Sequence, residues 1–340
     1  MISIGIIGAG NFSIKHIEAI EKLPNLHLKA ICRRDPLALN QLKKTYDLEG
    51  YTDYKGLLED ASIQAVLIAT PHHLHAEIAI EAAIAGKHIL MEKPMASTWE
   101  DCLAIHKTCE KNKVKLMLGQ VGQFTPAFLA ARKYLESGKL GDIHMARATS
   151  VSFWKHAERQ DWHLKKNTGG GYLLSVAVHQ MDLLCALIPS KVERVYAMIS
   201  NTFHRDEVDD GGIIVLKFSN GQQASLHFSG FKNGVNQVDA ELYGADGMLK
   251  ISFSQGAFLG KDQKWELLPD SFSENWMASA LESEWKGFAK AIELDQVPIV
   301  SGKHGLYVME VLFAALSSSA SGKEVSLTIN KTSNSINLRT

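Results

Sequence analysis

The chain has 340 residues, of which 46% are hydrophobic and 21% are charged, and its formal net charge is −1. This length predicts two domains, and this composition is typical of a globular protein with a large core. The near-neutral charge argues against nucleic acids and anionic membranes as partners, since both bind through a strongly basic face.

The start of the chain and its cysteines indicate a cytoplasmic protein. No stretch approaches the roughly 20 apolar residues of a membrane span, so we expect no membrane partner. The apolar residues 1–7 follow no basic segment and run directly into Gly8-Ala9-Gly10, which argues against a signal peptide. Four widely spaced cysteines without a C-x-x-C pattern are typical of reduced structural thiols.

The first third of the chain alternates short apolar runs with helical patterns. Strands are predicted at 2–7, 26–32, 65–69, 88–91 and 115–118, and helices at 12–22, 36–46, 54–59, 75–85 and 99–111. Such alternation predicts a doubly wound parallel sheet that is covered by helices on both faces. We assign residues 1–121 to this domain.

The pattern changes after Gly119, where strand patterns joined by tight turns predominate. Strands are predicted at 143–151, 192–200, 212–218, 223–228, 237–243 and 248–253, and helices at 125–137, 171–187, 275–294 and 303–319. Turns such as Ser219-Asn220-Gly221 favour antiparallel pairing. Residues 122–340 are therefore predicted to form an α+β domain with a mostly antiparallel sheet. Its polar tail from Asn330 onward is expected to be loosely held.

Gly8-Ala9-Gly10-Asn11-Phe12-Ser13 lies between the first predicted strand and the first predicted helix. The first glycine permits a sharp turn, the second lets the backbone approach a pyrophosphate, and the helix start attracts negative charge. Ser13 replaces the third glycine, so the pattern is incomplete, and an ordinary strand-to-helix turn is the alternative. Its place in a βαβ unit favours a dinucleotide site made by Gly8, Ala9, Gly10, Asn11 and Phe12.

The second strand is followed by Arg33-Arg34-Asp35. An acidic residue usually binds the ribose 2′-hydroxyl of NAD at this point, and Arg33 occupies the expected position. Two guanidinium groups suit a 2′-phosphate, because that pairing is charge-assisted and can be bidentate. We therefore predict NADP as the cofactor. NAD remains the alternative because Asp35 is close, and a solvated basic turn is the non-functional interpretation.

Two polar clusters follow the predicted parallel strands at 65–69 and 88–91. They are Thr70-Pro71-His72-His73-Leu74-His75 and Glu92-Lys93-Pro94. Open α/β sheets bind ligands at the carboxyl ends of their strands, so both clusters are candidates for a site. No acidic residue or cysteine lies at a metal-ligand spacing from the histidines, and we predict no metal site.

A glycine run, Gly169-Gly170-Gly171, precedes an apolar helical pattern that carries Ser175, His179 and Asp182. These three residues are spaced i, i+4 and i+7, which places them on one face of a helix. A polar stripe on an apolar helix is either hydrogen-bonded within the core or part of a site.

These motifs together resemble the Gfo/Idh/MocA family, which is named for glucose–fructose oxidoreductase and inositol dehydrogenase. The resemblance rests on the Gly8 loop, Thr70-Pro71 with His75, Glu92-Lys93-Pro94, the glycine run with His179 and Asp182, and the closing residues 319–325. Their order and spacing cover nearly the whole chain, and the combination is highly specific.

The resemblance implies a Rossmann domain followed by an α/β domain whose large, open-faced sheet often packs between subunits, hence a homodimer or homotetramer. It implies hydride transfer between nicotinamide and a hydroxyl-bearing carbon of a sugar, cyclitol or related polyol, an activity of the EC 1.1.1 type. Lys93 and His179 are the implied acid/base residues. The implied cofactor residues are Thr70, Pro71, His75, Glu92, Lys93, Gln120 and Trp162, and the implied substrate residues are Lys93, Trp162, Ser175 and His179.

The chain departs from the family at two positions. Many members have aspartate where this chain has Ser175, and many have arginine where it has Gln123. A serine hydroxyl can hydrogen-bond a substrate or His179, but it cannot supply the negative charge that would raise the histidine pKa.

Two other functions remain open. A protein that binds NAD(P) or a sugar without turnover would fit Ser175, although Lys93 and His179 are retained. A cofactor-assisted, NAD-dependent glycosidase on a similar scaffold is the second alternative. Absorbance of reduced nicotinamide separates them, since only the oxidoreductase changes it with substrate.

Overall fold

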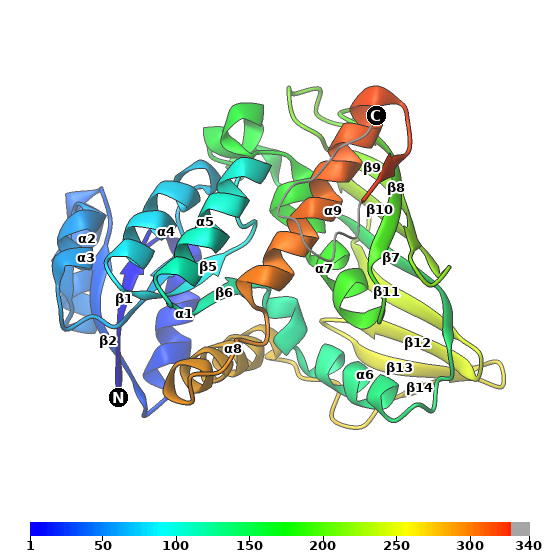
Figure 1. The fold of residues 1–340 in the computed structure, drawn as a ribbon, viewed down its shortest axis with the longest axis horizontal. Coiled ribbons are helices and arrows are strands. Elements are labelled where there is room, and N and C mark those ends of the chain that lie inside the picture. Colours follow the sequence, from blue (N-terminus) through cyan, green and yellow to red (C-terminus); the bar gives the residue numbers. More distant parts are fainter. Residues whose placement is uncertain (328–340) are drawn as a thin grey trace. The chain divides into compact units, whose positions relative to one another are not determined.

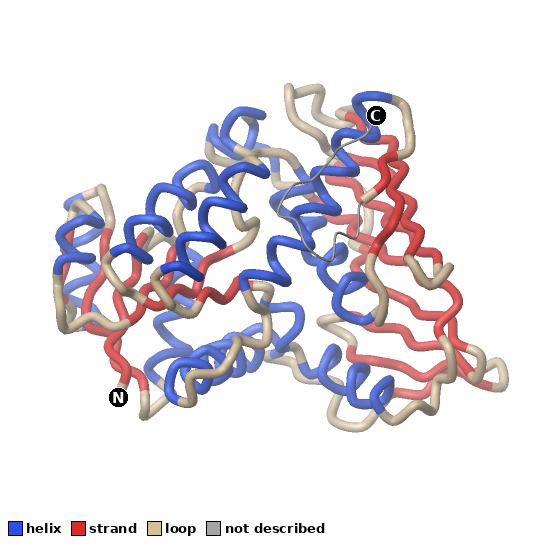
Figure 2. The backbone as a smooth tube through the Cα atoms, viewed as in Figure 1, coloured by secondary structure: helices blue, strands red, loops and turns tan. Residues whose placement is uncertain are grey.

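The computed structural model describes residues 1–327 (Figures 1 and 2). The chain forms two compact units, one of residues 1–121 with 277–306, the other of residues 122–276 with the described residues from 307 onward. The domain prediction placed 277–306 in the second domain, and the structure corrects this. Trp285 and Phe288 of that segment are fully buried, and Trp285 hydrogen-bonds His16 of the first unit. The tail from Asn330 lies outside the described residues.

The first unit contains, within the described chain, a six-stranded sheet in the order β3-β2-β1-β4-β5-β6. Every strand pair in it is parallel. Its strands are β1 Ile2–Ile7, β2 Leu26–Cys32, β3 Glu49–Tyr51, β4 Ala65–Ile68, β5 His88–Glu92 and β6 Leu116–Gly119. This strand order is that of a Rossmann dinucleotide-binding fold, so the predicted fold class is confirmed for this unit.

The helices of the first unit cover both faces of its sheet. They are α1 Asn11–Glu21, α2 Pro36–Tyr46, α3 Tyr54–Glu59, α4 His75–Ile84 and α5 Trp99–Lys111, joined by most of α8 Trp276–Glu293. Helices α4 and α5 lie side by side on one face, and α1 and α8 lie on the other (Figure 1). All four residues of β4 are buried, which explains its unbroken apolar sequence.

The second unit contains a nine-stranded sheet among its described residues, in the order β14-β13-β12-β11-β7-β10-β9-β8-β15. Its strands are β7 Ile143–Phe153, β8 Val192–Ser200, β9 Gly211–Phe218, β10 Gln223–Phe231, β11 Gln237–Gly244, β12 Gly247–Ser252, β13 Gly256–Lys261, β14 Lys264–Leu267 and β15 Val325–Ser326. Strands β7 and β10 pair in parallel, and the other pairs are antiparallel. The predicted mostly antiparallel sheet is therefore confirmed.

Helices pack on one face of this sheet. They are α6 Pro126–Glu136, α7 Val178–Leu187 and α9 Gly302–Ser321, the last mostly in this unit. Side-chain hydroxyls tie α9 to the sheet, since the backbone N–H of Ala197 donates to Ser318 Oγ across 3.0 Å and that of Val192 donates to Tyr307 Oη across 2.8 Å.

The other face of β8 and β9 carries exposed apolar side chains. Met198 is 68% exposed and stands opposite Ile213, which is 47% exposed. Tyr196 and Val215 form the neighbouring exposed pair, 42% and 48% accessible. This apolar face is the open face that the family resemblance implies.

One segment, residues 166–187, is long and apolar enough by length and composition to cross a membrane. The expectation that no stretch would reach this threshold was too strict. Within its most apolar window 83% is buried inside the structure, as in the core helix of a globular protein. The segment is therefore weak evidence for a membrane span.

Candidate active site

The phosphate loop has the backbone that its glycines predict. Gly8 has a φ of +93°, and a Cβ added there would lie 2.5 Å from the Ala69 carbonyl oxygen. Both the left-handed backbone and the close approach of the loop after β4 therefore require glycine.

Gly10 is different, because nothing inside the protein requires it to be glycine. Its φ is −92°, which any residue adopts, and a Cβ added there would come no closer than 3.9 Å to another heavy atom. The missing side chain leaves space on the outside of the loop, at the start of α1. No side chain caps that helix start, and its first turn has no acidic residue. This is a cradle that fits a dinucleotide pyrophosphate.

Ser13, at the position of the third glycine, is built into the loop. Its hydroxyl donates to the Gly8 carbonyl oxygen across 2.8 Å, and the residue is 1% exposed. The departure from the glycine pattern therefore stabilises the turn.

The three residues after β2, Arg33, Arg34 and Asp35, differ in their surroundings. Arg33 Nη1 donates to the Ala9 carbonyl oxygen across 2.8 Å, and Arg34 is exposed. Asp35 Oδ1 accepts the backbone N–H groups of Leu37 and Ala38, at 3.0 and 3.3 Å, and so caps α2. Asp35 was the reason to keep NAD as the alternative cofactor, and its role as a helix cap explains why an acidic residue stands there.

The turns after β4 and β5 are linked by His75, which is fully buried. Its Nδ1 lies 2.9 Å from the Pro94 carbonyl oxygen, and its Nε2 lies 2.9 Å from that of Thr70. Burial lowers the pKa of His75, which favours the neutral ring, and its single N–H can donate to only one of these two carbonyl oxygens at a time. His75 is therefore placed to position the two turns. The Thr70 hydroxyl is buried and has no hydrogen-bond partner within residues 1–327.

Lys93 follows β5 and is partly exposed, and Pro71 is partly exposed after β4. Glu92, the last residue of β5, is 9% exposed, and its Oε1 lies 3.0 Å from His16 Nε2 of α1. Gln120, directly after β6, is 3% exposed. These candidates all lie at or just beyond the carboxyl edge of the parallel sheet, as predicted.

In the second unit, the glycine run leads into a stretch of π-helix, Leu173–Ala177, which continues as α7. Gly171 has a φ of +104°. Ser175 lies within the π-helical stretch and is buried, and His179 is partly exposed one turn later. The regular helix expected from the sequence is therefore widened here, and such turns are frequent at functional sites.

Asp182, the third residue of the polar stripe, is paired with Gln123. The Gln123 side-chain amide donates to both carboxylate oxygens of Asp182, at 2.9 and 3.0 Å. The two residues are 1% and 5% exposed. The family's frequent arginine is thus replaced by a neutral amide donor that hydrogen-bonds both oxygens of the buried carboxylate.

Asp209 holds the start of the π-helical stretch, and sequence reasoning missed it. Its Oδ1 accepts the backbone N–H of Leu173 across 2.7 Å, and burial raises its pKa to about 6. A Cβ at Gly171 would collide with its carboxylate, which explains the third glycine of the run. The only sequence signal was an acidic pair, Asp209-Asp210, before a predicted strand.

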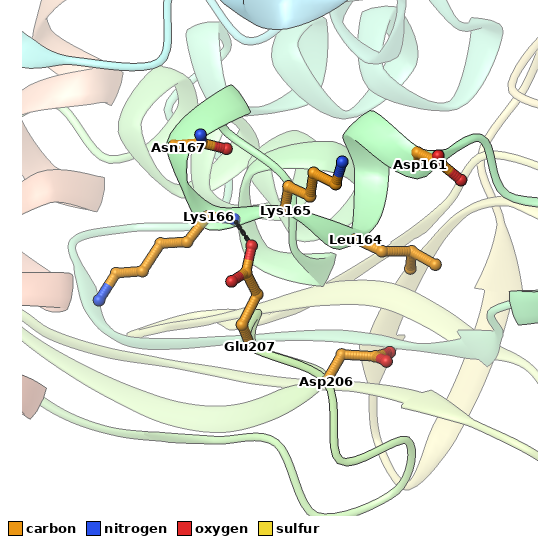
Figure 3. A pocket seen from close by; sticks show the side chains of 7 residues that line it. All are labelled: Asp161, Leu164, Lys165, Lys166, Asn167, Asp206 and Glu207. Atoms are coloured by element: carbon orange, nitrogen blue, oxygen red, sulfur yellow. Dashed lines mark hydrogen bonds between the residues drawn. The ribbon is translucent and has the colours of Figure 1, made fainter.

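A pocket of about 820 Å³ lies beside the loop that precedes the glycine run (Figure 3). It is lined by Asp161, Leu164, Lys165, Lys166, Asn167, Asp206 and Glu207, which come from two segments of the second unit. Glu207 Oε1 accepts the backbone N–H of Lys166 across 2.8 Å. The lining contains neither predicted catalytic residue. Trp162, next to Asp161, stacks on His163 with ring centroids 3.5 Å apart and donates to Gln160 Oε1.

Metal-binding residues do not gather in the part of the chain that the structure describes, where no group of three His, Cys, Asp or Glu side chains could hold an ion. All four cysteines lie in this part. They are buried and unbridged, and burial raises the pKa of each thiol.

Comparison with known proteins identifies the family. The profile described as "Oxidoreductase family, NAD-binding Rossmann fold" matches residues 2–120, and the profile described as "GFO/IDH/MocA C-terminal domain" matches residues 128–250. The chain belongs to the Gfo/Idh/MocA family and is an NAD-binding oxidoreductase of the EC 1.1.1 type.

Curated relatives and solved structures are consistent with this family assignment. Inositol 2-dehydrogenase of Rhizobium meliloti is 27% identical over 343 residues, which cover 96% of this chain and 99% of the relative. Levoglucosan dehydrogenase of Pseudarthrobacter phenanthrenivorans is 28% identical over 290 residues, 75% of this chain and 74% of the relative. A levoglucosan dehydrogenase solved with NADH and L-sorbose is 25% identical, with a TM-score of 0.87 over 96% of this chain and 98% of its own.

Proposed function

We propose that the protein is an NADP-dependent dehydrogenase or reductase that acts on a hydroxyl or keto carbon of a sugar, cyclitol or related small polyol. The observation that carries the proposal is Gly10, a glycine that the protein's own packing does not require and that leaves an open cradle at the start of α1. The names of the relatives, which include inositol and levoglucosan dehydrogenases, support the class of substrate.

Gly8, Ala9, Gly10, Asn11 and Phe12 would hold the pyrophosphate, because their backbone surrounds the cradle. Arg33 and Arg34 would face the 2′-phosphate. The bound cofactor supplies the hydride acceptor or donor at C4 of its nicotinamide. The capping role of Asp35 supports NADP over NAD. Because Asp35 caps α2, no acidic residue is left to bind the ribose 2′-hydroxyl of NAD.

Lys93 and His179 would move the proton. In the oxidative direction one of them accepts the proton of the substrate hydroxyl as the carbon loses its hydride, and in reduction the same group returns a proton to the oxygen. Ser175 and Trp162 would position the substrate. Thr70, Pro71, Glu92 and Gln120 would border the cofactor, and His75 would act through the backbone of Thr70 and Pro94.

The protein would work in the cytoplasm as a homodimer or homotetramer. Four buried, unbridged cysteines within the described residues support a reducing compartment. The exposed pairs Met198–Ile213 and Tyr196–Val215 support assembly through the open sheet face.

A screen of polyols and keto-sugars with NAD(H) and NADP(H), followed at the absorbance band of reduced nicotinamide, tests the function. We expect net absorbance change with at least one polyol or its keto form. Cofactor binding without any change across the screen would indicate the non-catalytic alternative. Release of sugar from a glycoside without net change would indicate the glycosidase alternative.

A further inference from the structure

A buried chain of hydrogen bonds lies beside the turn that carries Lys93. It joins Trp285 of α8, His16 of α1 and Glu92 of β5, all in the first unit. Trp285 and His16 are 0% exposed, and Glu92 is 9% exposed. Glu92 immediately precedes Lys93 in the sequence, yet the proposed mechanism gives neither His16 nor Trp285 a role.

The two partners of His16 fix which of its ring nitrogens carries the proton. Trp285 Nε1 lies 3.1 Å from His16 Nδ1, and an indole N–H can only donate, so Nδ1 is an acceptor without a proton. The single N–H of the ring is therefore on Nε2, which lies 3.0 Å from Glu92 Oε1 and donates to it. Each hydrogen bond of the chain thus has one direction, from indole to imidazole and from imidazole to carboxyl.

Packing holds the His16 ring and the Glu92 carboxyl in this arrangement. The ring of Phe12, in the phosphate loop, makes an edge contact with the His16 ring at a centroid distance of 5.2 Å, and the Trp285 ring makes another at 6.0 Å. The carboxyl fits closely against strand β6, since a Cβ added at Gly119 would lie 2.8 Å from Glu92 Oε1. These contacts leave the carboxyl little freedom to move.

The turn after β5 is therefore held at two points by buried histidines. His16 binds the side chain of Glu92, and Nδ1 of His75 lies 2.9 Å from the Pro94 carbonyl oxygen. The first histidine belongs to α1 and the second to α4, and these helices lie on opposite faces of the sheet (Figure 1). Lys93 is the residue between the two held positions.

We propose that His16 and Trp285 are positioning residues for Lys93, which hold the end of β5 so that the Lys93 ammonium keeps its place in the site. Both act through Glu92 and the backbone of the turn, and the inference rests on the proposed function of Lys93. A displacement of about 1 Å can lower the rate of an enzyme roughly 10²-fold. Loss of the chain should therefore reduce kcat by up to about this factor.

Nitrogen NMR of the full chain with isotope-labelled histidine tests the hydrogen-bond chain without substrate. The two ring tautomers differ in which nitrogen has the chemical shift of an N–H, and the signals lost in His16→Gln are those of His16. We expect the Nε2–H tautomer in the wild-type chain and altered His16 signals in Trp285→Phe. A proton on Nδ1 in the wild-type chain, or unaltered signals in Trp285→Phe, overturns the proposal.

Steady-state kinetics test the positioning role. Trp285→Phe keeps an aromatic ring but removes the indole N–H, so kcat should fall by roughly 10- to 10²-fold while the KM for the cofactor stays near the wild-type value. Trp154→Phe is the matched control, because Trp154 is also 0% exposed and its Nε1 has no hydrogen-bond partner within residues 1–327. The control should keep the wild-type kcat. A merely structural role would lower the Tm of Trp285→Phe and leave its kcat unchanged, which overturns the proposal.

Two variants of His16 keep the test valid if Trp285→Phe does not fold. Glutamine has an amide oxygen that can accept from the indole and an amide N–H that can donate to Glu92, whereas leucine has neither. His16→Gln should therefore retain a kcat about tenfold or more above that of His16→Leu. Equal losses in the two variants overturn the positioning role. If the wild-type chain turns over no substrate, the proposed function fails and the positioning role with it, while the NMR result still decides the hydrogen-bond chain.

Discussion

Nη1 of Arg33 lies 2.8 Å from the carbonyl oxygen of Ala9, so the end of β2 is tied directly to the phosphate loop. One donor of the guanidinium orients the side chain there, and a guanidinium has five. We predict that the wild-type chain prefers NADP and that Arg33→Asp reverses the preference. Each charge-assisted hydrogen bond to the 2′-phosphate contributes roughly 1.5–3 kcal/mol, which is about 10- to 150-fold in Kd.

Fluorescence titrations with NAD and NADP measure this preference. Arg34→Asp is the matched control, since Arg34 is exposed. It should weaken NADP binding without creating a preference for NAD as strong as that of Arg33→Asp. Equal affinities of the wild-type chain for the two cofactors would show that the assignment of NADP is wrong.

The second prediction concerns Lys93, His179 and Ser175. Lys93→Ala and His179→Ala should each lower turnover by about 10²–10⁴-fold, the usual contribution of general acid–base catalysis, while both still bind cofactor. Ser175→Ala should lose less, because a neutral hydroxyl only positions the substrate. Steady-state rates and cofactor titrations of the three variants measure these effects.

Turnover near the wild-type level in both the Lys93 and the His179 variants would exclude this mechanism. A loss in Ser175→Ala as large as theirs would instead make the hydroxyl a direct participant in proton transfer.

The third prediction concerns assembly through the open sheet face. Ile213→Lys places an ammonium between exposed apolar side chains, which should convert the oligomer to smaller species without unfolding the chain. Light scattering coupled to gel filtration at micromolar concentration measures the mass. Ile84→Lys is the control, since Ile84 is 66% exposed on α4 of the other unit. A monomeric wild-type chain would refute the proposed interface.

The fourth prediction is a pH dependence of stability at Asp209. Its pKa of about 6 lies above the ordinary value near 3.9, so the native state favours the protonated carboxyl. The resulting stabilisation is complete below about pH 4 and is lost as the pH rises through about 6. Asp209→Asn keeps an oxygen that can accept the Leu173 N–H but cannot ionise.

The difference in Tm between Asp209→Asn and the wild-type chain should therefore grow in favour of the variant from pH 4 to about 6. It should then level off. Asp161→Asn, a change at an exposed carboxyl, should show no such trend. A difference that stays constant across this range would contradict the raised pKa.

Most helices and strands of the first unit could be predicted from the sequence, because buried parallel strands have unbroken apolar sequences. β1 and β2 have the predicted bounds, as do α2, α3 and α5. Strand β3 was missed because its three residues, Glu49-Gly50-Tyr51, show neither an apolar run nor an alternation. Strands β13 and β14 were missed because the first is rich in glycine and the second is exposed throughout.

The assignment of α8 failed for a different reason. An amphipathic pattern shows that a helix buries one face, but it does not show which sheet covers that face. In the site, the motifs at strand ends could be predicted from their local sequence. The partners of Glu92 could not, because His16 is 76 positions away from it and Trp285 is 269 positions away from His16. The π-helical turn around Ser175 could not be predicted either, since an apolar run is compatible with both an α-helix and a π-helix.

The discontinuity of the first unit has a consequence for biosynthesis. When residues 1–121 have left the ribosome, all six strands of the parallel sheet are present, but residues 277–306 are not yet made. Until Trp285 is translated, the Nδ1 of His16 lacks its indole donor and the apolar surface that α8 covers faces water. The nascent first unit therefore stays incomplete, with exposed apolar surface that favours aggregation, until most of the second unit has been synthesised.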